Sequence, residues 1–219
     1  MTSREFRERL LRRARRANST VNADWIEPLE KYFDLLARWN ATINLTALPL
    51  QEPTDATFDR LFIEPLAAAR YVANQSDSWC DLGSGGGSPA IPLKVSRPLL
   101  KLTMIEAKAR KAAFLREAVR ILALPNAGVI DKRFDELTDA DAGLGSYGLV
   151  TVRAVRSDRK LFDVSARLLR PGGRLLLFRP TDHPIVADGF GYADTAVLMD
   201  APRNYLSMLT RMFHVEQSG

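Results

Sequence analysis

An α/β fold, with a mostly parallel sheet, an antiparallel edge and a set of preceding N-terminal helices, is predicted by three observations. After residue 78, short apolar runs alternate with segments of helical periodicity, as in consecutive βαβ units. Before residue 75, only helical patterns recur. The chain has 219 residues, of which 46% are apolar, and this suffices for one hydrophobic core. We therefore expect a single globular unit in which a helical extension, residues 1–75, packs on an α/β domain, residues 76–219.

The first helix is expected to begin after Thr2, because Thr2 and Glu5 have the spacing of a capping box. Phe6, Leu10 and Ala14 then recur on one side of the helix. The other faces carry arginines, which indicate either a solvated amphipathic helix or a surface that binds phosphates. These arginines are Arg4, Arg7, Arg9, Arg12, Arg13, Arg15 and Arg16.

A second helix is predicted from a cap at Asp24, and apolar residues from Leu29 to Trp39 continue at helical spacing. We expect the aromatic residues of this helix to lie in the core. A third helical segment covers residues 55–73, where Pro65 predicts a kink or a break.

The strands and helices of the α/β domain are predicted from the spacing of its apolar residues. Strands are expected where apolar runs are short, and helices where apolar residues recur every three to four positions. Right-handed crossovers then join the parallel strands, and the last two strands supply the antiparallel edge. The predicted strands are residues 78–82, 102–105, 128–130, 149–152, 174–178, 195–199 and 205–212, and the predicted helices are residues 89–95, 107–122 and 158–169.

Composition narrows the class of protein. The single cysteine, Cys80, permits no internal disulfide, suits a reducing compartment and is expected to be buried in a strand. Only His183 and His214 supply imidazole, so we expect no metal site. The net charge of +5 favours a polyanionic partner. No apolar stretch reaches the length of a membrane span and no secretory signal is evident, so we expect a cytoplasmic protein without membrane contact.

The motif DLGSGGGSPAIPL, which starts at Asp81, places a glycine-rich stretch between a predicted strand and a predicted helix. Such a turn lets a ligand approach the backbone beside the unpaired N–H groups of the helix. The dinucleotide fingerprint fits imperfectly, because Ser88 stands where that pattern has Gly or Ala. The shorter pattern Gly-x-Gly-x-Gly fits from Gly83 onward. The carboxylate of Asp81 suits the amino group of S-adenosylmethionine, whereas it would repel a pyrophosphate.

Glu106 stands at the predicted end of the second strand. A carboxylate in that place can accept hydrogen bonds from both ribose hydroxyls, in NAD sites as in S-adenosylmethionine sites. It therefore indicates a ribose-containing cofactor without deciding between the two. The plain alternative is a tight strand-to-helix turn that binds no ligand, but packing alone does not explain the glycines together with the two acids.

Upstream of the glycine-rich stretch stands WNATINLT, residues 39–46. Together with GSGGGSPAIPL, this string resembles the family of bacterial small-subunit ribosomal RNA guanine-N7 methyltransferases, also called glucose-inhibited division protein B. The resemblance covers about residues 32–179. Further matches are the segment Arg110-Lys111-Ala112-Ala113-Phe114-Leu115 after Glu106, the segment Arg133-Phe134-Asp135-Glu136, and Val152-Arg153-Ala154.

This resemblance implies a Rossmann-like class I methyltransferase fold, with S-adenosylmethionine as cofactor and a methyl group transferred to N7 of a guanine. Because N7 carries a lone pair, the transfer needs no general base and can rest on positioning and charge. An arginine would hold O6 or phosphates and leave N7 free. The implied partner is small-subunit ribosomal RNA, in the small subunit or an assembly intermediate, and we expect a monomer.

The candidate site residues fall into two groups. For cofactor binding we predict Asp81, Gly83, Gly85, Gly87, Ser88, Glu106, Phe134, Asp135 and Arg153. For catalysis we predict Arg153, Asn44 and Arg179. Further candidates to hold the RNA are Arg38, Arg60 and Arg156, although Arg38 and Arg156 are better interpreted as surface arginines or helix caps. The basic pair Arg110-Lys111 is a source of salt-dependent affinity.

The chain also departs from the family's pattern. The departures are Leu61 for a usual His, Glu64 for Asp, Pro65 for Ser, Ala90 for Gly, and Arg179-Pro180 for Lys-Gly. We expect the changes at Ala90 and Glu64 to leave cofactor binding intact, and those at Leu61 and Arg179 to affect the side that faces RNA.

Two other functions remain open at this point. An NAD(P)-dependent Rossmann oxidoreductase would share the glycine-rich turn, but beyond His183 the sequence offers no convincing proton donor. A catalytically weak or silent protein that binds S-adenosylmethionine and RNA is the second alternative. The departures that keep it open are Leu61, Glu64, Pro65, Arg179 and Pro180.

Overall fold

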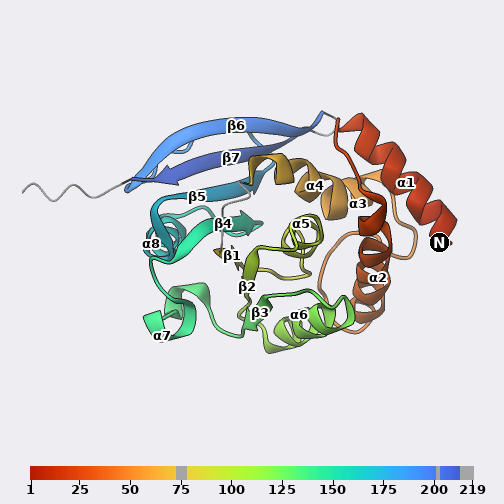
Figure 1. The fold of residues 1–219 in the computed structure, drawn as a ribbon, viewed down its shortest axis with the longest axis horizontal. Coiled ribbons are helices and arrows are strands. Elements are labelled where there is room, and N and C mark those ends of the chain that lie inside the picture. Colours follow the sequence, from red (N-terminus) through yellow and green to blue (C-terminus); the bar gives the residue numbers. More distant parts are fainter. Residues whose placement is uncertain (73–77, 201–202, 213–219) are drawn as a thin grey trace, which may run out of the picture.

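The computed structural model describes residues 1–72, 78–200 and 203–212. Within these residues one seven-stranded sheet has the order β3-β2-β1-β4-β5-β7-β6 (Figure 1). Strands β1 to β5 run parallel, and β7 and β6 complete the sheet in antiparallel pairing. The strands are β1 (Ser78–Leu82), β2 (Lys101–Ile105), β3 (Ala127–Ile130), β4 (Tyr147–Arg153), β5 (Leu169–Arg179), β6 (Phe190–Asp200) and β7 (Arg203–Arg211).

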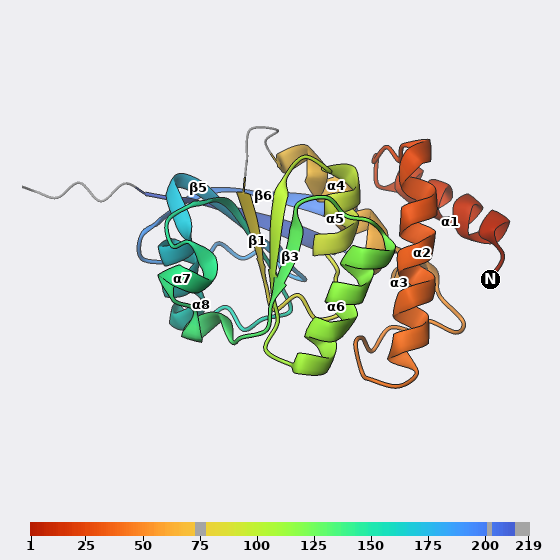
Figure 2. The ribbon, with the colours of Figure 1, turned by 60° about the horizontal axis from the view of Figure 1, so that its bottom comes forward.

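Helices cover both faces of the sheet, as the crossovers between parallel strands require. Helices α5 and α6 lie on one face, and α8 lies on the other beside the short helix α7 (Figures 1 and 2). The bounds of these helices are α5 (Ala90–Ser96), α6 (Ala109–Ile121), α7 (Asp139–Ala142) and α8 (Arg159–Leu168), and a 3₁₀ turn covers Phe134–Glu136.

The N-terminal residues form a third layer outside α5 and α6. Helix α2 packs on α5 and α6, while α1 packs on the segment that follows α2 (Figure 2). This segment reaches the edge of the antiparallel pair, where α4 contacts β6. The elements are α1 (Ser3–Arg16), α2 (Ala23–Asn40), α3 (Asp55–Phe58), a π-helical turn (Asp59–Ile63), α4 (Glu64–Ala68) and a 3₁₀ turn (Ala69–Tyr71).

One apolar core joins this third layer to the sheet. Phe6 of α1, Tyr32 of α2 and Trp79 of β1 belong to the same cluster of buried side chains. A second cluster lies on the opposite face, where Cys80 of β1 meets residues of α8 such as Leu161. Neighbouring residues of β1 thus serve opposite faces, as the alternation of side chains along a strand requires.

The predicted α/β fold is confirmed, and each predicted strand overlaps an observed one. Strand β1 has the predicted bounds, and Cys80 is buried in it as predicted. The capping box at Thr2 is also present. The predicted cap at Asp24 is wrong: the side chain of Asn22 accepts a hydrogen bond from the N–H of Asp24, so α2 begins at Ala23. The side chain of Asn22 thus satisfies the N–H of Asp24, which is one of the unpaired donors of the first turn.

The helical segment predicted over residues 55–73 is not one kinked helix. It consists of α3, the π-helical turn, α4 and a 3₁₀ turn that ends at Tyr71, and residue 73 lies outside the described residues. Pro65 stands in the first turn of α4, where its missing N–H is tolerated. The irregularity lies before Pro65, in the turn Asp59–Ile63. This turn is called the π-turn below.

The prediction that Arg13 lies on a solvated or phosphate-binding face is also wrong. Its guanidinium is buried between α1 and the π-turn, where it pairs with Asp59. Two further arginines of α1, Arg9 and Arg12, lie within 4 Å of Asp55. Part of the basic face of α1 therefore forms ion pairs with the segment that contains Asp55 and Asp59, and these pairs hold α1 against it. Throughout the described ranges, no helix combines the length and apolar character that crossing a membrane requires.

Candidate active site

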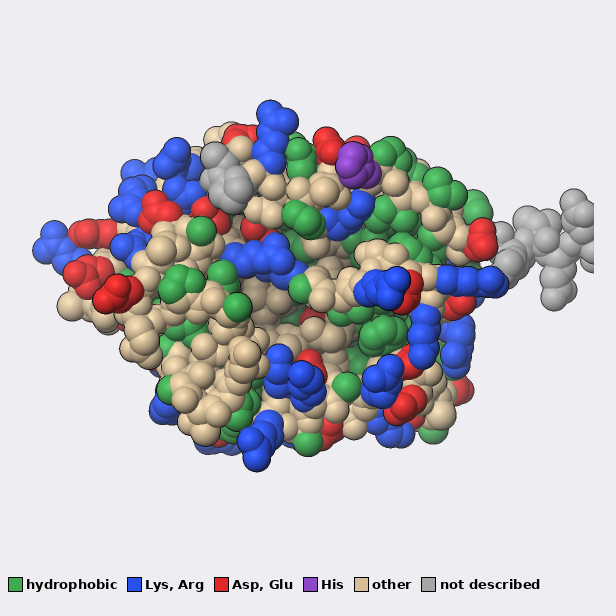
Figure 3. All heavy atoms as spheres, turned by 180° about the vertical axis from the view of Figure 1, so that it is seen from behind, with side chains coloured by type: hydrophobic (Ala, Val, Ile, Leu, Met, Phe, Trp, Pro, Cys, Tyr) green, Lys and Arg blue, Asp and Glu red, His purple; other side chains and the backbone are tan. Residues whose placement is uncertain are grey.

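A pocket of about 440 Å³ opens at the carboxyl ends of β1, β2 and β4. The strand order reverses between β1 and β4, the place where open α/β sheets bind ligands. The face seen in Figure 3 is hollowed near its centre, and Lys and Arg side chains surround the hollow. The residues that line the pocket are Leu36, Leu45, Thr46, Ala47, Leu48, Arg60, Leu61, Gly83, Ser84, Gly85, Gly86, Ser88, Glu106, Lys111, Arg153 and Ala154.

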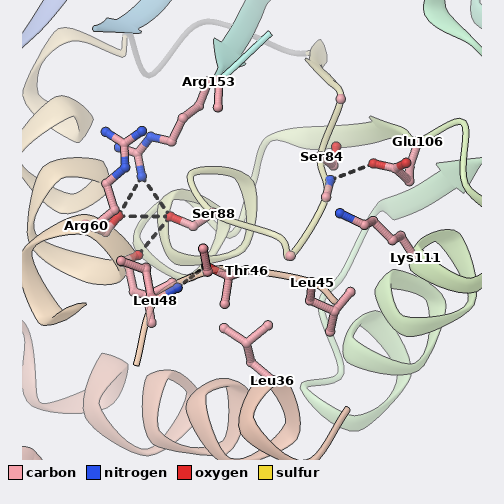
Figure 4. A pocket seen from close by; sticks show the side chains of 16 residues that line it. Leu36, Leu45, Thr46, Leu48, Arg60, Ser84, Ser88, Glu106, Lys111 and Arg153 are labelled. Carbon is pink, nitrogen blue, oxygen red and sulfur yellow. Dashed lines mark hydrogen bonds between the residues drawn. The ribbon is translucent and has the colours of Figure 1, made fainter. Parts of the chain in front are cut away.

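The pocket has two chemically different ends. Glu106 and Lys111 lie at one end, and Arg60 and Arg153 lie together at the other (Figure 4). The glycine-rich loop, residues 83–87, runs between the two ends. An elongated ligand along this loop would meet a carboxylate at one end and guanidinium groups at the other.

The glycine-rich loop depends on backbone angles that favour glycine. Gly83 has φ +72° and Gly87 has φ +89°. A Cβ at Gly87 would stand 2.5 Å from Cδ1 of Ile91 and 3.3 Å from the ring of Tyr32. The hydroxyl of Tyr32 donates a 2.6 Å hydrogen bond to the carbonyl oxygen of Gly86, so α2 supports the loop from behind. Gly87 therefore shapes the loop without lining the pocket.

Glu106 follows β2, and its carboxylate bridges two segments of backbone. One oxygen accepts the N–H of Gly85 at 2.8 Å, and the other accepts the N–H of Lys108 at 2.9 Å. Glu106 is 7% exposed and lines the pocket. Because each carboxylate oxygen has two lone pairs, Glu106 retains capacity for two further donors. The structure thus brings Glu106 and the glycine-rich loop together, as the sequence predicts.

Asp81 lies beneath the loop and does not line the pocket. It is 1% exposed, and its carboxylate accepts a hydrogen bond from the hydroxyl of Thr151 on β4. The indole N–H of Trp79 in turn donates to Thr151 at 2.8 Å. Burial raises the pKa of Asp81 to about 6, although the hydrogen bond from Thr151 opposes the shift. A buried carboxylate held in this way suits a functional site more than a stable core.

Arg153, the last residue of β4, is the most densely bonded side chain at the pocket. Its Nη1 donates to the carbonyl oxygen of Arg60 at 2.6 Å and to Oγ of Ser88 at 3.0 Å. Its Nη2 donates to Glu64 at 2.7 Å, and its guanidinium stacks 4.3 Å from the ring centroid of Phe178. Burial lowers the pKa of Arg153 to about 10, so the group stays charged at neutral pH.

One N–H donor of Arg153, at Nε, is buried and has no acceptor among the described residues. Such a donor is rare in a protein interior unless a ligand or a water uses it. The structure brings together Arg153 and Ser88, which the sequence predicts separately as cofactor-binding residues.

The segment WNATINLT forms a wall of the pocket through its backbone turn. The side-chain oxygen of Asn40 accepts the N–H groups of Leu45 and Thr46, at 2.8 and 2.9 Å. This turn directs the chain from Leu45 to Leu48 along the pocket. Asn44, which the sequence predicts as catalytic, is exposed and does not line the pocket.

Several other predicted residues do not line the pocket either. Arg179 donates to the carbonyl oxygen of His183 at 2.7 Å and to Ser207 at 3.2 Å. Phe134 and Asp135 lie in the 3₁₀ turn after β3, where Asp135 pairs with Arg133 and Lys160. Outside the pocket lining lie Asn44, Asp81, Gly87, Phe134, Asp135, Arg179, Arg38 and Arg156, and His214 lies outside the described residues.

Sequence reasoning missed the support that α2 and α4 give to the site. Tyr32 reads as a core aromatic, and no local signal shows that its hydroxyl reaches the glycine-rich loop. Glu64 is noticed only as a departure, although it is the ion-pair partner of Arg153. A charged residue within the apolar run from Leu61 to Leu66 is the signal that could have marked Glu64 as a buried partner.

Comparison with known families gives a match over most of the chain. A family model described as GidB, rRNA small subunit methyltransferase G, matches residues 25–184. The ribosomal RNA small subunit methyltransferase G of Xanthomonas campestris pv. campestris (strain B100) is 39% identical over 160 residues, which are 73% of this chain and 71% of that protein. The protein of the same name from Stenotrophomonas maltophilia (strain K279a) is 40% identical over 163 residues, 74% and 73% of the two chains.

Solved structures of distant proteins share the fold. An S-adenosylmethionine-dependent methyltransferase from Aquifex aeolicus has a TM-score of 0.56 at 11% identity, over 69% of this chain and 91% of that one. TYW2 of P. horikoshii, solved in complex with MeSAdo, has a TM-score of 0.54 at 11% identity, over 68% and 61% of the two chains. At these identities the likeness shows the fold alone, which is the class I methyltransferase fold.

Proposed function

The chain belongs to the family of rRNA small subunit methyltransferase G, and we propose that its pocket brings N7 of a guanine to the methyl group of S-adenosylmethionine. The protein is thus an S-adenosylmethionine-dependent methyltransferase that acts on small-subunit ribosomal RNA. The observation that carries the proposal is one pocket that combines the glycine-rich loop, Glu106 and Arg153 at the switch point of the sheet.

The residues at the pocket fit this cofactor. Glu106 has unused acceptor capacity for the ribose hydroxyls, and Gly83, Gly85 and Gly86 offer bare backbone along the pocket. The buried, unpaired Nε of Arg153 can donate to the carboxylate of an amino acid moiety. We retain Asp81 as the group that favours the cofactor's ammonium charge from beneath the loop.

When bound, S-adenosylmethionine supplies an electrophilic methyl group on a sulfonium. The protein does not have to remove a proton from the acceptor, because guanine N7 presents a lone pair. Its task is to align N7 with the methyl carbon and to exclude water from the line of transfer. The apolar side chains of Leu45, Leu48 and Leu61 on the pocket wall serve this exclusion.

Arg60 is the pocket residue best placed to meet the RNA. Its side chain is 32% exposed at the pocket, whereas the side chain of Arg153 is 6% exposed and already bonded to protein groups. An exposed guanidinium can hold a phosphate or the O6 atom of the target base. We propose Arg60 for this contact, and Arg153 as a residue that touches the cofactor. We propose that Asn44 and Arg179 contact the RNA strand outside the pocket.

The wider biological setting is also proposed. An RNA substrate within the small subunit or its assembly intermediate, a monomeric enzyme and a cytoplasmic location all suit a methyltransferase of ribosomal RNA. Residues 1–72 of the helical extension would serve as a fixed wall of the site, because Leu36, Leu45 and Arg60 belong to them and line the pocket.

The test is methyl transfer from labelled cofactor to purified small subunits that lack the modification. We expect label in the ribosomal RNA and one site of N7-methylguanosine, mapped by chemical strand scission. Glu106→Ala should lower the rate at limiting cofactor, while the matched surface variant Glu27→Ala should not. Absence of transfer despite tight cofactor binding would favour the silent binding protein. Binding of NADH without binding of S-adenosylmethionine in equilibrium dialysis would favour the oxidoreductase.

A further inference from the structure

The buried ion pair between Arg13 and Asp59 lies outside the pocket but acts on a segment that touches it. Nε of Arg13 donates to Oδ1 of Asp59 at 2.7 Å, and Nη2 donates to Oδ2 at 2.5 Å. Arg13 is 4% and Asp59 is 3% exposed. This bidentate geometry fixes both the position and the orientation of the Asp59 carboxylate. Asp59 is the first residue of the π-turn, so Arg13 holds the start of that turn against α1.

The π-turn leaves a carbonyl oxygen without its usual helical partner. In an α-helix the carbonyl of Arg60 would accept the N–H of Glu64, but here this N–H donates to the carbonyl of Asp59. The next candidate donor, residue 65, is a proline and has no N–H. The carbonyl oxygen of Arg60 is therefore available to side chains, and Arg153 donates to it at 2.6 Å. The hydroxyl of Ser88 lies between the carbonyl oxygens of Leu61 and Arg60, at 3.0 and 3.3 Å.

The same turn also places the counter-charge of Arg153. Glu64 follows the π-turn directly, and its carboxylate lies 2.7 Å from Nη2 of Arg153. Arg153 thus receives a carbonyl oxygen and a carboxylate from one short segment, whose first residue is held by Arg13. A shift of the π-turn would displace both acceptors together.

We propose that Arg13 is a positioning residue of the active site, which acts through Asp59 to hold the π-turn in the geometry that presents the Arg60 carbonyl and the Glu64 carboxylate to Arg153. The inference rests on the proposed function, because it assigns the pocket beside Arg153 to the cofactor. It adds a role for α1 that neither the glycine-rich loop nor the chemistry of methyl transfer requires. Pro65 gains a role as well, since a residue with an N–H could compete for the freed carbonyl.

The test replaces the ion pair by an apolar pair and measures cofactor binding. A buried ion pair can often be exchanged for hydrophobic residues of similar volume without loss of stability. We therefore choose the double variant Arg13→Met with Asp59→Leu. The matched control is Arg4→Gln with Glu8→Gln, which removes an exposed ion pair of the same helix. Folding is checked by thermal unfolding, and binding of S-adenosylhomocysteine is measured by calorimetry well below the melting temperature of each protein.

We expect the double variant to bind S-adenosylhomocysteine about tenfold more weakly, the scale of a slightly misplaced site group, and the control to bind like the unchanged protein. In the methylation assay, KM for the cofactor should rise, and KM for the RNA should rise with it, because Arg60, the proposed RNA contact, belongs to the π-turn. A purely structural pair would lower the melting temperature and leave both KM values of the folded protein unchanged. Unchanged affinity in a folded double variant overturns the proposal.

A second variant decides the matter if the double variant does not fold. Arg13→Lys keeps the charge but cannot make the bidentate contact with Asp59. We expect it to weaken cofactor binding, and unchanged affinity would overturn the proposal. The unchanged protein is measured first, because its failure to bind S-adenosylhomocysteine would overturn the proposed function itself. Binding by the unchanged protein together with equal binding by both Arg13 variants would remove only the role of Arg13.

Discussion

Oε2 of Glu64 lies 2.7 Å from Nη2 of Arg153 and 3.3 Å from Nη1 of Arg60, so one buried carboxylate serves two guanidinium groups. The side chain of Glu64 is 1% exposed. Burial raises the pKa of Glu64, while the charges of Arg153 and Arg60 oppose this rise. The carboxylate of Glu64 therefore holds two positive groups close together, and burial of this one acid is the energetic cost.

Glu64→Gln should destabilise the protein strongly, because it leaves Arg153 charged and buried without its counter-charge. Removing one partner of a buried ion pair costs about 3–5 kcal/mol. Urea unfolding at pH 7 measures the effect. Glu27→Gln removes an exposed partner of Lys31 on α2 and should leave the unfolding midpoint within experimental error. Equal midpoints for the two variants would contradict the importance of the buried pair.

Tyr32→Phe tests the support of the glycine-rich loop by α2. The substitution removes the 2.6 Å hydrogen bond to the carbonyl oxygen of Gly86 and leaves that oxygen without this donor. We expect a loss of about 1–2 kcal/mol in the free energy of unfolding and weaker binding of S-adenosylhomocysteine. Tyr192→Phe is the matched control, since the hydroxyl of Tyr192 bonds to Thr195 on the exposed side of β6. A Tyr32→Phe protein with unchanged cofactor affinity would show that the loop holds its shape alone.

The strands could be predicted because their signal is local. A short run such as Trp79 to Leu82, which is apolar except for Asp81 and lies between a polar segment and a glycine-rich turn, is typical of a buried parallel strand. Glu106 could be predicted for the same reason, since the carboxyl end of β2 fixes its place in the site. These features depend on residues that are neighbours in the sequence.

The features that the sequence does not predict depend on partners far along the chain. Arg13 lies next to Ala14 of the apolar stripe, but its partner Asp59 is 46 residues away. The carbonyl that accepts the hydroxyl of Tyr32 is 54 residues away. The local spacing of apolar residues predicts which face of a helix is buried, but it does not predict a specific polar contact between layers. Only the packing of α1 on the π-turn, and of α2 on α5 and α6, reveals these two contacts.

Gly87→Ala tests whether the loop needs glycine for its conformation. Gly87 has φ +89°, and a Cβ would come within 2.5 Å of Ile91. We expect a loss of about 2–3 kcal/mol from backbone strain and overpacking together. Gly172→Ala is the control, because Gly172 has φ +75° but open space around it, and strain alone costs about 1 kcal/mol. Similar losses for both variants in chemical denaturation would mean that the contact with Ile91 relaxes freely.

Titration of Asp81 makes the free energy of unfolding fall as the pH rises from about 4 to about 6. Burial raises the pKa of Asp81 to about 6 in the folded protein, whereas an aspartate in the unfolded chain titrates near 3.9, as a rough reference. Between these values the folded state binds the proton more tightly. The folded state is therefore favoured by protonation at low pH, and this contribution is lost as the pH rises through 6, up to about 3 kcal/mol in total.

Asp81→Asn removes that titration while keeping the size and the hydrogen bonding of the side chain. We expect the free energy of unfolding of the variant, relative to the unchanged protein, to increase from pH 4 to pH 7 and to stay constant above pH 7. Cofactor binding should move the other way, because the ionised carboxylate favours the cofactor's ammonium group. The unchanged protein should bind S-adenosylhomocysteine more tightly at pH 7.5 than at pH 5, and the variant should bind weakly at both. A stability difference that does not vary with pH would show that Asp81 titrates like an exposed acid, and its fixed place between Thr151 and the loop would then carry no electrostatic cost.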